Sequence, residues 1–277
     1  MTLPNFVKPV LDQAADLGLM AIFFLVLALL VKGAKAWSDA RAAAEETRIN
    51  LILYGVDQVL MTPIVVLIAA AFAQTVHAMG WDAPGAALWD KLGGIATAFI
   101  AVFVADFLGY WRHRLQHSAL LWPGHAVHHS DTQLTWFSLN RMHPIDRLGT
   151  ILDLIGLTLL GFPTWAVALA VMVRHYYGAF IHADVPWTLG RFGWVFNSPA
   201  MHRWHHARDE EISGKNFATV FSVFDRAFGT YYCPGPCTVP LGIEAPMAPG
   251  ALGQYLYPLQ AWFGARPEPV SRVAKGL

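Results

Sequence analysis

The sequence has few charged residues and almost no cysteine. Charged residues make up 14% of its 277 residues, whereas a soluble domain typically has about 25%. The net charge is zero, so no basic surface is expected to bind nucleic acid. Cys233 and Cys237 are too few for a disulfide framework or a four-thiolate zinc site. Together with a mean hydropathy of +0.41, this composition favours a protein embedded in a membrane.

Three hydrophobic runs predict membrane-spanning helices. The runs are residues 16–31, 51–73 and 92–111, each close to the roughly 20 apolar residues that a span needs. Pro63 lies within the second run and predicts a kink. The charged, alanine-rich residues 32–50 predict an aqueous helix, and the glycine- and proline-containing residues 74–91 predict a loop. The N-terminus lacks the basic region and cleavage site of a signal peptide, so we expect the first run to be retained.

Residues 148–180 contain two shorter apolar stretches on either side of Gly161-Phe162-Pro163. Neither is long enough for a full span, and either a helical hairpin that enters the membrane and returns or one kinked span fits both lengths. After residue 182 the sequence has the character of a soluble protein. The predicted fold class is therefore all-α integral membrane, with about three spanning helices, a helical hairpin and a histidine-rich helical cap.

Histidine is the conspicuous polar residue, with twelve copies, and all but His77 follow residue 112. Eight of them form three clusters, which are His113 and His117, then His125, His128 and His129, then His202, His205 and His206. Spacings of three and four residues place side chains on one face of a helix, one turn apart. Pro123 and Pro199 precede the second and third clusters, and Ser198 is suited to cap a helix there. The three clusters are therefore predicted to be metal ligands, the second and third of them on the opening turns of helices.

Eight imidazoles exceed the ligands of a single ion, so two metal ions are predicted. The clusters contain no carboxylate, and the first lacks the glutamate of the metalloprotease HExxH motif. Imidazole alone does not choose between zinc, copper, iron and nickel. An adjacent apolar domain favours a lipid substrate, whose unactivated C–H bonds require O2 chemistry at a redox metal. Two iron ions are the predicted cofactor, although zinc can displace iron during purification.

Positive charge predicts the orientation in the membrane. The loop after the first run carries Lys32, Lys35, Arg41 and Arg48, whereas the loop after the second carries only Lys91. Cytoplasmic loops are enriched in such residues, so the first loop is expected in the cytoplasm, and the third span returns to that side. The protein is predicted to cross the membrane several times, with every histidine cluster on the cytoplasmic side.

Asp106 is predicted to share one face of the third spanning helix with His113 and His117. A carboxylate in this position can accept an N–H from a ligating histidine and fix its tautomer. The alternative interpretation is an ion pair between Asp106 and Arg112 or Arg114.

Several motifs of the chain resemble the fatty acid hydroxylase/sterol desaturase superfamily, over about residues 100–232. They are Asp106-Phe-Leu-Gly-Tyr-Trp-Arg-His113-Arg-Leu-Gln-His117, Leu121-Trp122, His125-Ala-Val-His128-His129-Ser130, Arg141-Met-His143-Pro144, His182-Ala-Asp184, Ser198-Pro199 with the third cluster, and Asn216 through Asp225-Arg226 to Tyr231. The sequence departs from the common pattern at Asp184, at Phe217-Ala218 and at Phe224. These departures leave the subfamily open, because no cluster histidine is lost.

The resemblance implies a few transmembrane helices beneath a cytosolic cap that holds a two-metal centre. It suggests His182 as a ninth ligand, and His143, His175 and Asp184 as further ligands or hydrogen-bond partners of ligands. It also implies three regions, which are N-terminal transmembrane helices with a cytosolic linker (1–99), a catalytic domain (100–232) and a C-terminal cytosolic tail (233–277).

The predicted activity is hydroxylation or desaturation of a sterol, fatty acyl or related isoprenoid lipid with O2 and two electrons. The sequence has no GxGxxG, haem or iron–sulfur motif, so an external donor such as a ferredoxin or a cytochrome b5-like protein is expected. An ether-lipid monooxygenase of the alkylglycerol type, reduced by a pterin, is the main alternative. A bis-histidine haem electron carrier and a metal-ion transporter are alternatives from other classes.

Overall fold

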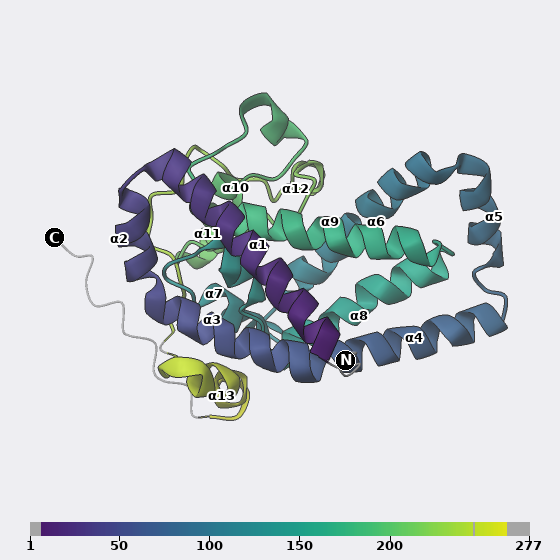
Figure 1. Cartoon of the computed structure of the whole chain (residues 1–277), viewed down its shortest axis with the longest axis horizontal. Helices are drawn as coiled ribbons and strands as arrows, with labels where there is room; N and C mark the ends of the chain where they lie inside the picture. Colours follow the sequence, from purple (N-terminus) through teal and green to yellow (C-terminus); the bar gives the residue numbers. More distant parts are fainter. Residues whose placement is uncertain (1–6, 246, 265–277) are drawn as a thin grey trace.

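The computed structural model describes residues 7–245 and 247–264, and side chains from residue 12 onward. The described part is helical and contains no β-strand beyond one isolated bridge between Ala207 and Leu241. Long helices extend to the right in Figure 1 as a bundle, and short helices and loops form a cap at its other end. This arrangement confirms the predicted all-α fold class.

The first half of the chain forms the helices of the long apolar segments and the shorter helices that connect them. They are α1 (Val7–Lys32), α2 (Lys35–Ala42), α3 (Ala44–Val56), the π-helical turn η1 (Asp57–Met61), α4 (Thr62–Ala78), α5 (Ala83–Leu92) and α6 (Gly94–Gln116). The second half forms the hairpin and the cap. Its elements are α7 (Trp122–His129), η2 (Trp136–Asn140), α8 (Pro144–Leu159), α9 (Thr164–His182), η3 (Gly190–Trp194), α10 (Pro199–His205), α11 (Glu210–Ser213), α12 (Val223–Ala227) and α13 (Gly250–Phe263).

Among the described residues, three helical segments are long and apolar enough to cross a membrane, as predicted. They are Asp12–Lys32, Ala44–Ala78 and Gly94–Gln116. The second is longer than the hydrophobic run from which it was predicted, because the preceding charged residues continue the same helix. At its centre, the π-helical turn Asp57–Met61 distorts the helix just before Pro63, which lies in the first turn of α4.

The prediction of a loop over residues 74–91 is wrong. Helix α4 continues to Ala78, and most of the remaining stretch forms α5. The glycine and proline residues mark helix boundaries here, because Pro84 lies in the first turn of α5 and Gly93 follows its last turn in a positive-φ conformation.

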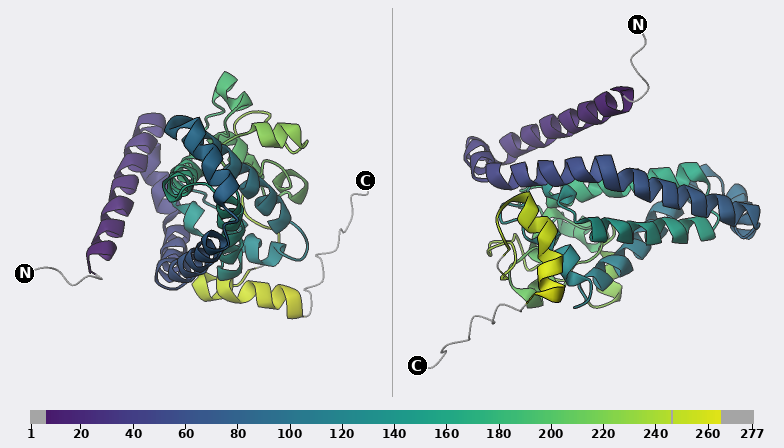
Figure 2. Two further views of the ribbon diagram at one scale, coloured as in Figure 1. Left: turned by 90° about the vertical axis from the view of Figure 1, so that its right-hand side faces the viewer. Right: turned by 90° about the horizontal axis from the view of Figure 1, so that it is seen from below.

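Small side chains allow the helices of the bundle to pack closely. Helix α6 packs against α8 and α9, and α4 packs against α8. Figure 2 shows α1 on the outside of this assembly and α13 beneath the cap. Ala101 and Ala105 of α6 are buried with Ala166 and Ala170 of α9. Small residues at such contacts let helix backbones approach within the membrane.

Charged residues also lie inside the bundle, close to the cap. Asp153 of α8 pairs with Arg112 of α6 at 3.1 Å and with Arg174 of α9 at 3.0 Å. Arg174 also pairs with Asp106 at 3.4 Å. This network links α6, α8 and α9 close to the cap, and each buried charge has an opposite charge beside it, as an apolar environment requires.

The predicted C-terminal tail packs on the cap through Leu241, which forms the bridge with Ala207, and through helix α13. This helix packs against α7 and α3, and the Ser130 hydroxyl donates a 2.8 Å hydrogen bond to the Gln254 side chain. The Trp262 indole N–H donates to the Leu120 carbonyl at 3.0 Å. Residues 265–277 of the predicted tail lie outside the described residues.

The turn between α8 and α9 gives a test of the hairpin. Gly161 has φ +69°, and a Cβ there would overlap the Asp82 carbonyl oxygen. Gly80 has φ +68° but lies in open space. Each Gly→Ala change imposes the backbone cost of about 1–2 kcal/mol for a left-handed residue. We expect Gly161→Ala to lower the thermal unfolding midpoint in detergent clearly more than Gly80→Ala, and equal shifts would contradict this packing.

Candidate metal centre

Nine histidines converge where the bundle meets the cap. They come from the end of α6 (His113 and His117), from α7 (His125, His128 and His129), from the last residue of α9 (His182) and from the end of α10 (His202, His205 and His206). Helices α7 and α10 are short, with a proline in their first turn. The Ser198 hydroxyl accepts a 3.1 Å hydrogen bond from the Met201 amide and caps α10. The two HxxHH clusters therefore lie on short helices with a proline in the first turn, and the predicted Ser198 cap is present on α10.

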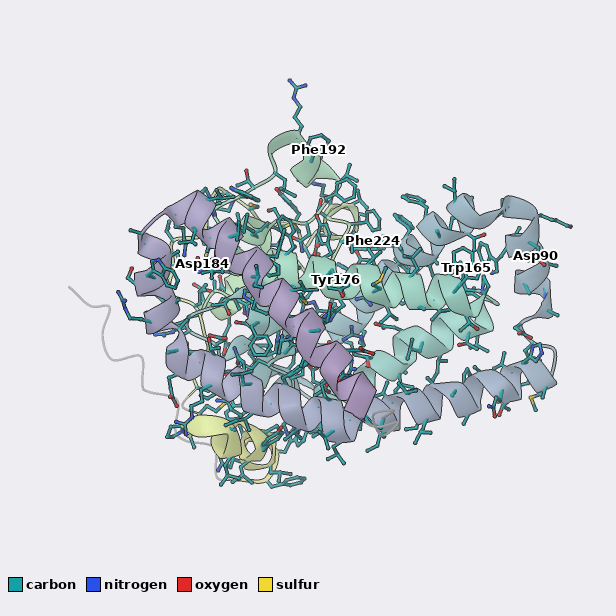
Figure 3. All side chains as sticks on the ribbon, in the orientation of Figure 1. Asp90, Trp165, Tyr176, Asp184, Phe192 and Phe224 are labelled. Atoms are coloured by element: carbon teal, nitrogen blue, oxygen red, sulfur yellow. The ribbon has the colours of Figure 1, made fainter. Side chains whose placement is uncertain are left out.

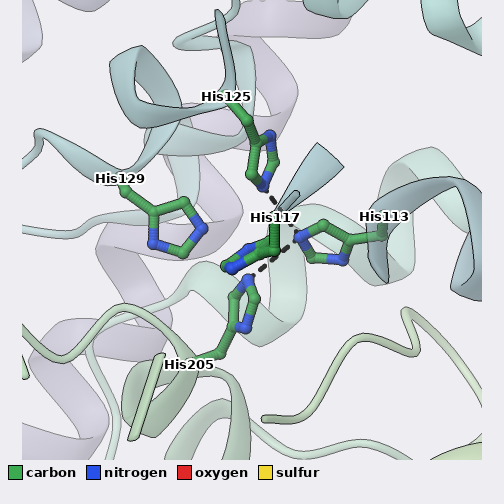
Figure 4. A group of neighbouring side chains, drawn as sticks. All are labelled: His113, His117, His125, His129 and His205. Carbon is green, nitrogen blue, oxygen red and sulfur yellow. Dashed lines mark hydrogen bonds between the residues drawn. The ribbon is translucent and has the colours of Figure 1, made fainter. Parts of the chain in front are cut away.

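The imidazoles form two groups, and within each group the nearest ring nitrogens lie within 4.8 Å of one another. The first group consists of His113, His117, His125, His129 and His205, which point toward a common centre in Figure 4. The second group consists of His128, His182, His202 and His206. The groups adjoin, since the rings of His129 and His206 stack with centroids 4.4 Å apart.

Close approaches between ring nitrogens define both centres. In the first group, the Nε2 atom of His113 lies 3.0 Å from that of His125 and 2.9 Å from that of His205. In the second, Nε2–Nε2 distances of 3.1–3.2 Å link His128 to His182, His182 to His202 and His202 to His206.

These spacings fit metal coordination. Metal–imidazole bonds of about 2.0–2.1 Å place two ligand nitrogens of one ion about 2.9–3.4 Å apart at angles between octahedral and tetrahedral. All the Nε2–Nε2 distances lie within that range. Two neutral imidazoles that face each other with lone pairs repel unless a cation lies between them. The residues therefore fit two metal ions, one for each group.

Backbone carbonyls orient four of the rings. In each of them Nδ1 lies close to a carbonyl oxygen. The distances are 2.8 Å from His113 to Phe217, 2.6 Å from His205 to Lys215, 3.3 Å from His128 to Arg141 and 2.7 Å from His182 to Gly178. A carbonyl only accepts, so Nδ1 must carry the hydrogen. The Nε2 lone pair of each ring is then directed to the centre, as a metal ligand requires.

A carboxylate orients the fifth ring. The Nδ1 atom of His125 lies 3.1 Å from Asp146 Oδ2, and the Gln116 amide donates to the other carboxylate oxygen. Asp146 was not among the predicted site residues. Its only signal in the sequence is its position two residues after Pro144, in the first turn of the helix that follows the Arg-Met-His-Pro motif. Carboxylate–histidine pairs of this kind raise the basicity of a ligand.

Burial keeps the imidazoles neutral. It lowers the pKa of His205 to about 3 and the pKa of His128 to about 4. Burial and the neighbouring imidazoles also lower the pKa values of His129, His202 and His206 well below 6.5. Neutral imidazole is the form that binds metal.

Several ring nitrogens have no hydrogen-bond partner although they are buried. They are His117 Nε2, both ring nitrogens of His129, His202 Nδ1 and His206 Nδ1. Each unsatisfied buried polar atom costs about 1–3 kcal/mol. A bound ion would account for the unpartnered atoms that face a centre, such as His117 Nε2.

Three further predicted residues lie outside both groups. His143 caps α8, with its Nδ1 accepting from the Ile145 amide and its Nε2–H directed at the Tyr255 carbonyl. His175 is exposed on α9 beside the Tyr176 ring. Asp184 pairs with Lys32 and, at 3.3 Å, with Arg203. The structure thus does not bring His143, His175 or Asp184 to the metal centre.

The predicted contact between Asp106 and a ligating histidine is wrong. The Asp106 carboxylate accepts backbone N–H groups of Thr219, Val220 and Phe221 at 3.2, 2.9 and 2.7 Å. Its charged partner is Arg174 rather than Arg112 or Arg114. The physical reason is distance, because seven residues separate Asp106 from His113, a rise of about 10 Å along the helix, which a short side chain does not bridge.

Asp225 holds the same loop from the other side. Its carboxylate accepts from the Phe217 and Ala218 amides at 2.7 and 3.0 Å and from the Thr230 hydroxyl at 2.7 Å. Burial raises the pKa of Asp225 to about 7. Asn216 begins the loop at φ 58°, a conformation that asparagine tolerates. The motif from Asn216 to Thr230 thus fixes the Phe217 carbonyl that orients His113.

The geometry defines this chain as a histidine-rich membrane protein whose two imidazole groups could each hold a metal ion. Residues 98–230 match the fatty acid hydroxylase family. An ornithine lipid hydroxylase of Rhizobium tropici is 31% identical over 71% of this chain and 58% of its own length. Alkylglycerol monooxygenases of Danio rerio and Homo sapiens are each 31% identical over 52% of this chain, which covers 31% and 32% of their lengths. No solved structure matches the chain.

Over residues 98–230, just under half of its length, the chain is similar to the fatty acid hydroxylase family. A methylsterol monooxygenase of Arabidopsis thaliana, 28% identical over 51% of this chain and 54% of its own length, is a further relative. The chain spans between about a third and about three fifths of the length of these relatives.

The two buried carboxylates are expected to have separable roles. Asp146→Asn removes the negative charge that His125 contacts, so we expect a metal affinity about 10- to 100-fold weaker, measured by competition with a chelator. Asp106→Asn, the matched control, breaks the contacts of the 219–221 loop. It is expected to lower the thermal unfolding midpoint while the folded fraction keeps its metal affinity. The reverse pattern would contradict both assignments.

The metal-free protein is expected to lose stability in mild acid. His128 has its ordinary pKa of 6.5 when unfolded and a pKa of about 4 when folded. The unfolded state therefore binds more protons between these values, and stability falls as pH drops through that window, by up to about 1.4 kcal/mol per pH unit for each such group. Denaturant unfolding at pH 7.5 and 5.5 measures the loss. His128→Gln should reduce it, and an unchanged loss would count against a buried, neutral His128.

Proposed function

We propose that this protein is an integral-membrane oxygenase that holds two iron ions and oxidises a lipid with O2. The observation that carries the proposal is the pair of adjoining imidazole groups with Nε2–Nε2 spacings of 2.9–3.2 Å. Its position at the end of an apolar bundle, and relatives named as lipid hydroxylases and monooxygenases, support a lipid substrate.

The iron ions would supply O2 reduction and removal of hydrogen from an unactivated carbon. The overall change inserts one oxygen atom into a C–H bond, and two electrons and two protons convert the other oxygen atom to water. Loss of a second hydrogen instead would give a double bond. The nine histidines would hold the ions, and the Nδ1 contacts to carbonyls and to Asp146 would keep the rings oriented. Burial of the imidazoles would limit access of water.

The two electrons that reduce O2 must come from a separate donor, because the sequence has no GxGxxG, haem or iron–sulfur motif. A ferredoxin or cytochrome b5-like protein fits a cap that faces the cytoplasm. The excess of Lys32, Lys35, Arg41 and Arg48 on the cap side of the first two spans supports that orientation. These residues belong to α1, α2 and α3, which reach the cap, whereas α5 lies at the far end of the bundle (Figure 1).

An ether-lipid monooxygenase is the second candidate, because alkylglycerol monooxygenases are among the relatives. Cleavage of an ether after oxidation would release an aldehyde, whereas simple hydroxylation would leave the lipid intact and 16 mass units heavier. Product analysis therefore separates the two candidates.

The geometry does not suit the remaining alternatives. A bis-histidine haem needs two nitrogens on opposite sides of one iron, about 4 Å apart, with a porphyrin between them. Groups of five and four imidazoles at 2.9–3.2 Å leave no such space. A transporter would hold its ligands at mid-membrane, whereas the two groups lie at the cap end of the helices.

Turnover is expected to depend on each imidazole of the two groups. We expect His129→Ala, His205→Ala and His206→Ala each to abolish product, because each would open a coordination position. His77→Ala, on the far end of α4, and His175→Ala, outside both groups, serve as controls and should keep near wild-type activity. Mass spectrometry of host lipids, scored for a gain of 16 or a loss of 2 mass units, gives the result. Graded, partial losses across the group variants would contradict a metal centre built from them.

The orientation can be tested in a variant with Cys233 and Cys237 replaced by serine, since both thiols are free. Single cysteines introduced at Lys35 and Lys215 should react with an impermeant reagent from the cytoplasmic side, and one at Asp82 from the opposite side. Labelling of Asp82 together with Lys35 from the same side would overturn the proposed topology.

A further inference from the structure

A groove of about 810 Å³ lies outside the metal centre, between α1, α2, α3 and two cap segments, residues 132–137 and 183–185. None of the nine histidines lines it. Its size is within the range of about 300–1,000 Å³ that is typical of small-molecule sites. The groove is therefore separate from the metal centre, and the residues described there do not explain it.

The walls of the groove are mainly apolar. Leu17, Ala21, Phe24 and Leu25 of α1 form one side, and Trp136 forms part of the other. Helix α1 packs through Met20 and Phe24 against the end of α9 and the cap, and Phe24 stacks on Trp136 with ring centroids 5.1 Å apart. Most of the side chains of α1 are exposed, although α1 is apolar enough to span a membrane. The groove is therefore suited to an acyl chain that arrives from the bilayer.

One end of the groove is charged and carries an excess of cations. Its lining includes Lys32, Lys35, Arg48 and Arg203, against two carboxylates, Asp39 and Asp184. Lys32 and Arg203 are engaged with the two carboxylates and are largely buried.

Lys35 and Arg48 are the accessible cations, with side chains 70% and 74% exposed. Their contacts within the chain, to Asp39 at 3.2 Å and to Glu45 at 3.7 Å, are exposed pairs of the kind that contribute little. A charge pattern of this kind complements an acidic group at the end of an acyl chain.

The charged end of the groove is adjacent to the second histidine group along the chain. Asp184 follows the ligand His182 by two residues, and Arg203 directly follows His202. Figure 3 shows Asp184 beside α2 and the adjoining end of α1. The ion pair between Lys32 and Asp184 thus connects the wall of the groove to the segment that carries His182.

We infer that this groove binds a membrane lipid with an acidic head group, whose acyl chain lies along α1 and whose head group is held by Lys35 and Arg48. The inference rests on the proposed function in one respect, namely that the bound lipid is the substrate class of the adjacent metal centre. A neutral sterol would use the apolar walls but not the charged end.

Photo-crosslinking of the full-length protein in phosphatidylcholine nanodiscs tests the inference. The probe is phosphatidylglycerol with a diazirine in one acyl chain, and the comparison probe is phosphatidylcholine with the same chain. We expect phosphatidylglycerol to label peptides from residues 17–28 and 132–137. Each of Lys35→Gln and Arg48→Gln should weaken its labelling about fivefold, from roughly 1 kcal/mol per cation near a membrane surface. Lys91→Gln, the same change on α5, should have no effect.

A bulky side chain tests the position of the acyl chain. Ala28 lines the groove, whereas Ile22 is exposed on α1 and does not line it. Ala28→Trp should therefore reduce labelling by both probes, and Ile22→Trp should not. If the two lipids label the protein equally, and if Lys35→Gln and Arg48→Gln do not change that labelling, the inference of an acidic head group is overturned. Labelling that Ala28→Trp leaves unchanged would overturn the groove as the site.

The binding readout separates this inference from the proposed function. If phosphatidylglycerol labels the groove but the protein oxidises no lipid, the proposed function fails and the groove stands as a lipid site. If the protein oxidises lipid while Ala28→Trp and Lys35→Gln alter neither labelling nor turnover, the proposed function stands and the groove inference fails.

Discussion

The mutual approach of neutral imidazole nitrogens is the constraint on which the rest of the structure depends. Lone pairs 2.9–3.2 Å apart are unfavourable by themselves and favourable around a cation. Burial that holds His128 and His205 uncharged at neutral pH increases the need for that cation. Folding of this region and metal binding are therefore linked, since the cap brings four separate segments to one place.

Residues around the imidazoles hold the rings in position from two sides. Asp106 from the bundle and Asp225 from the cap both bind backbone amides of the loop 217–221, and the Phe217 carbonyl of this loop orients His113. On the opposite side, Asp146 at the start of α8 orients His125. Buried carboxylates in this protein thus position the loop and the rings, and the imidazoles alone form the two groups.

Much of this could be predicted from the sequence, because periodicity and spacing are local. The three spans, the hairpin and the clusters of short-spaced histidines follow from helix geometry and apolar length. The division of the nine histidines into groups of five and four could not be predicted, since it depends on how four segments meet. The predicted role of Asp106 was wrong for the same reason. A shared helix face shows that two side chains point the same way, but not that they are close enough to contact. The backbone amides that Asp106 binds lie more than a hundred residues away in the sequence.

The central claim is that the two imidazole groups each hold one metal ion. Elemental analysis of the intact protein, purified without chelators from iron-supplied cells, tests it most directly when combined with a variant from each group. The account predicts about two transition-metal ions per chain, with His113→Ala and His202→Ala each lowering the count toward one. A count near zero in the unaltered protein, or a count that neither variant changes, would contradict the account.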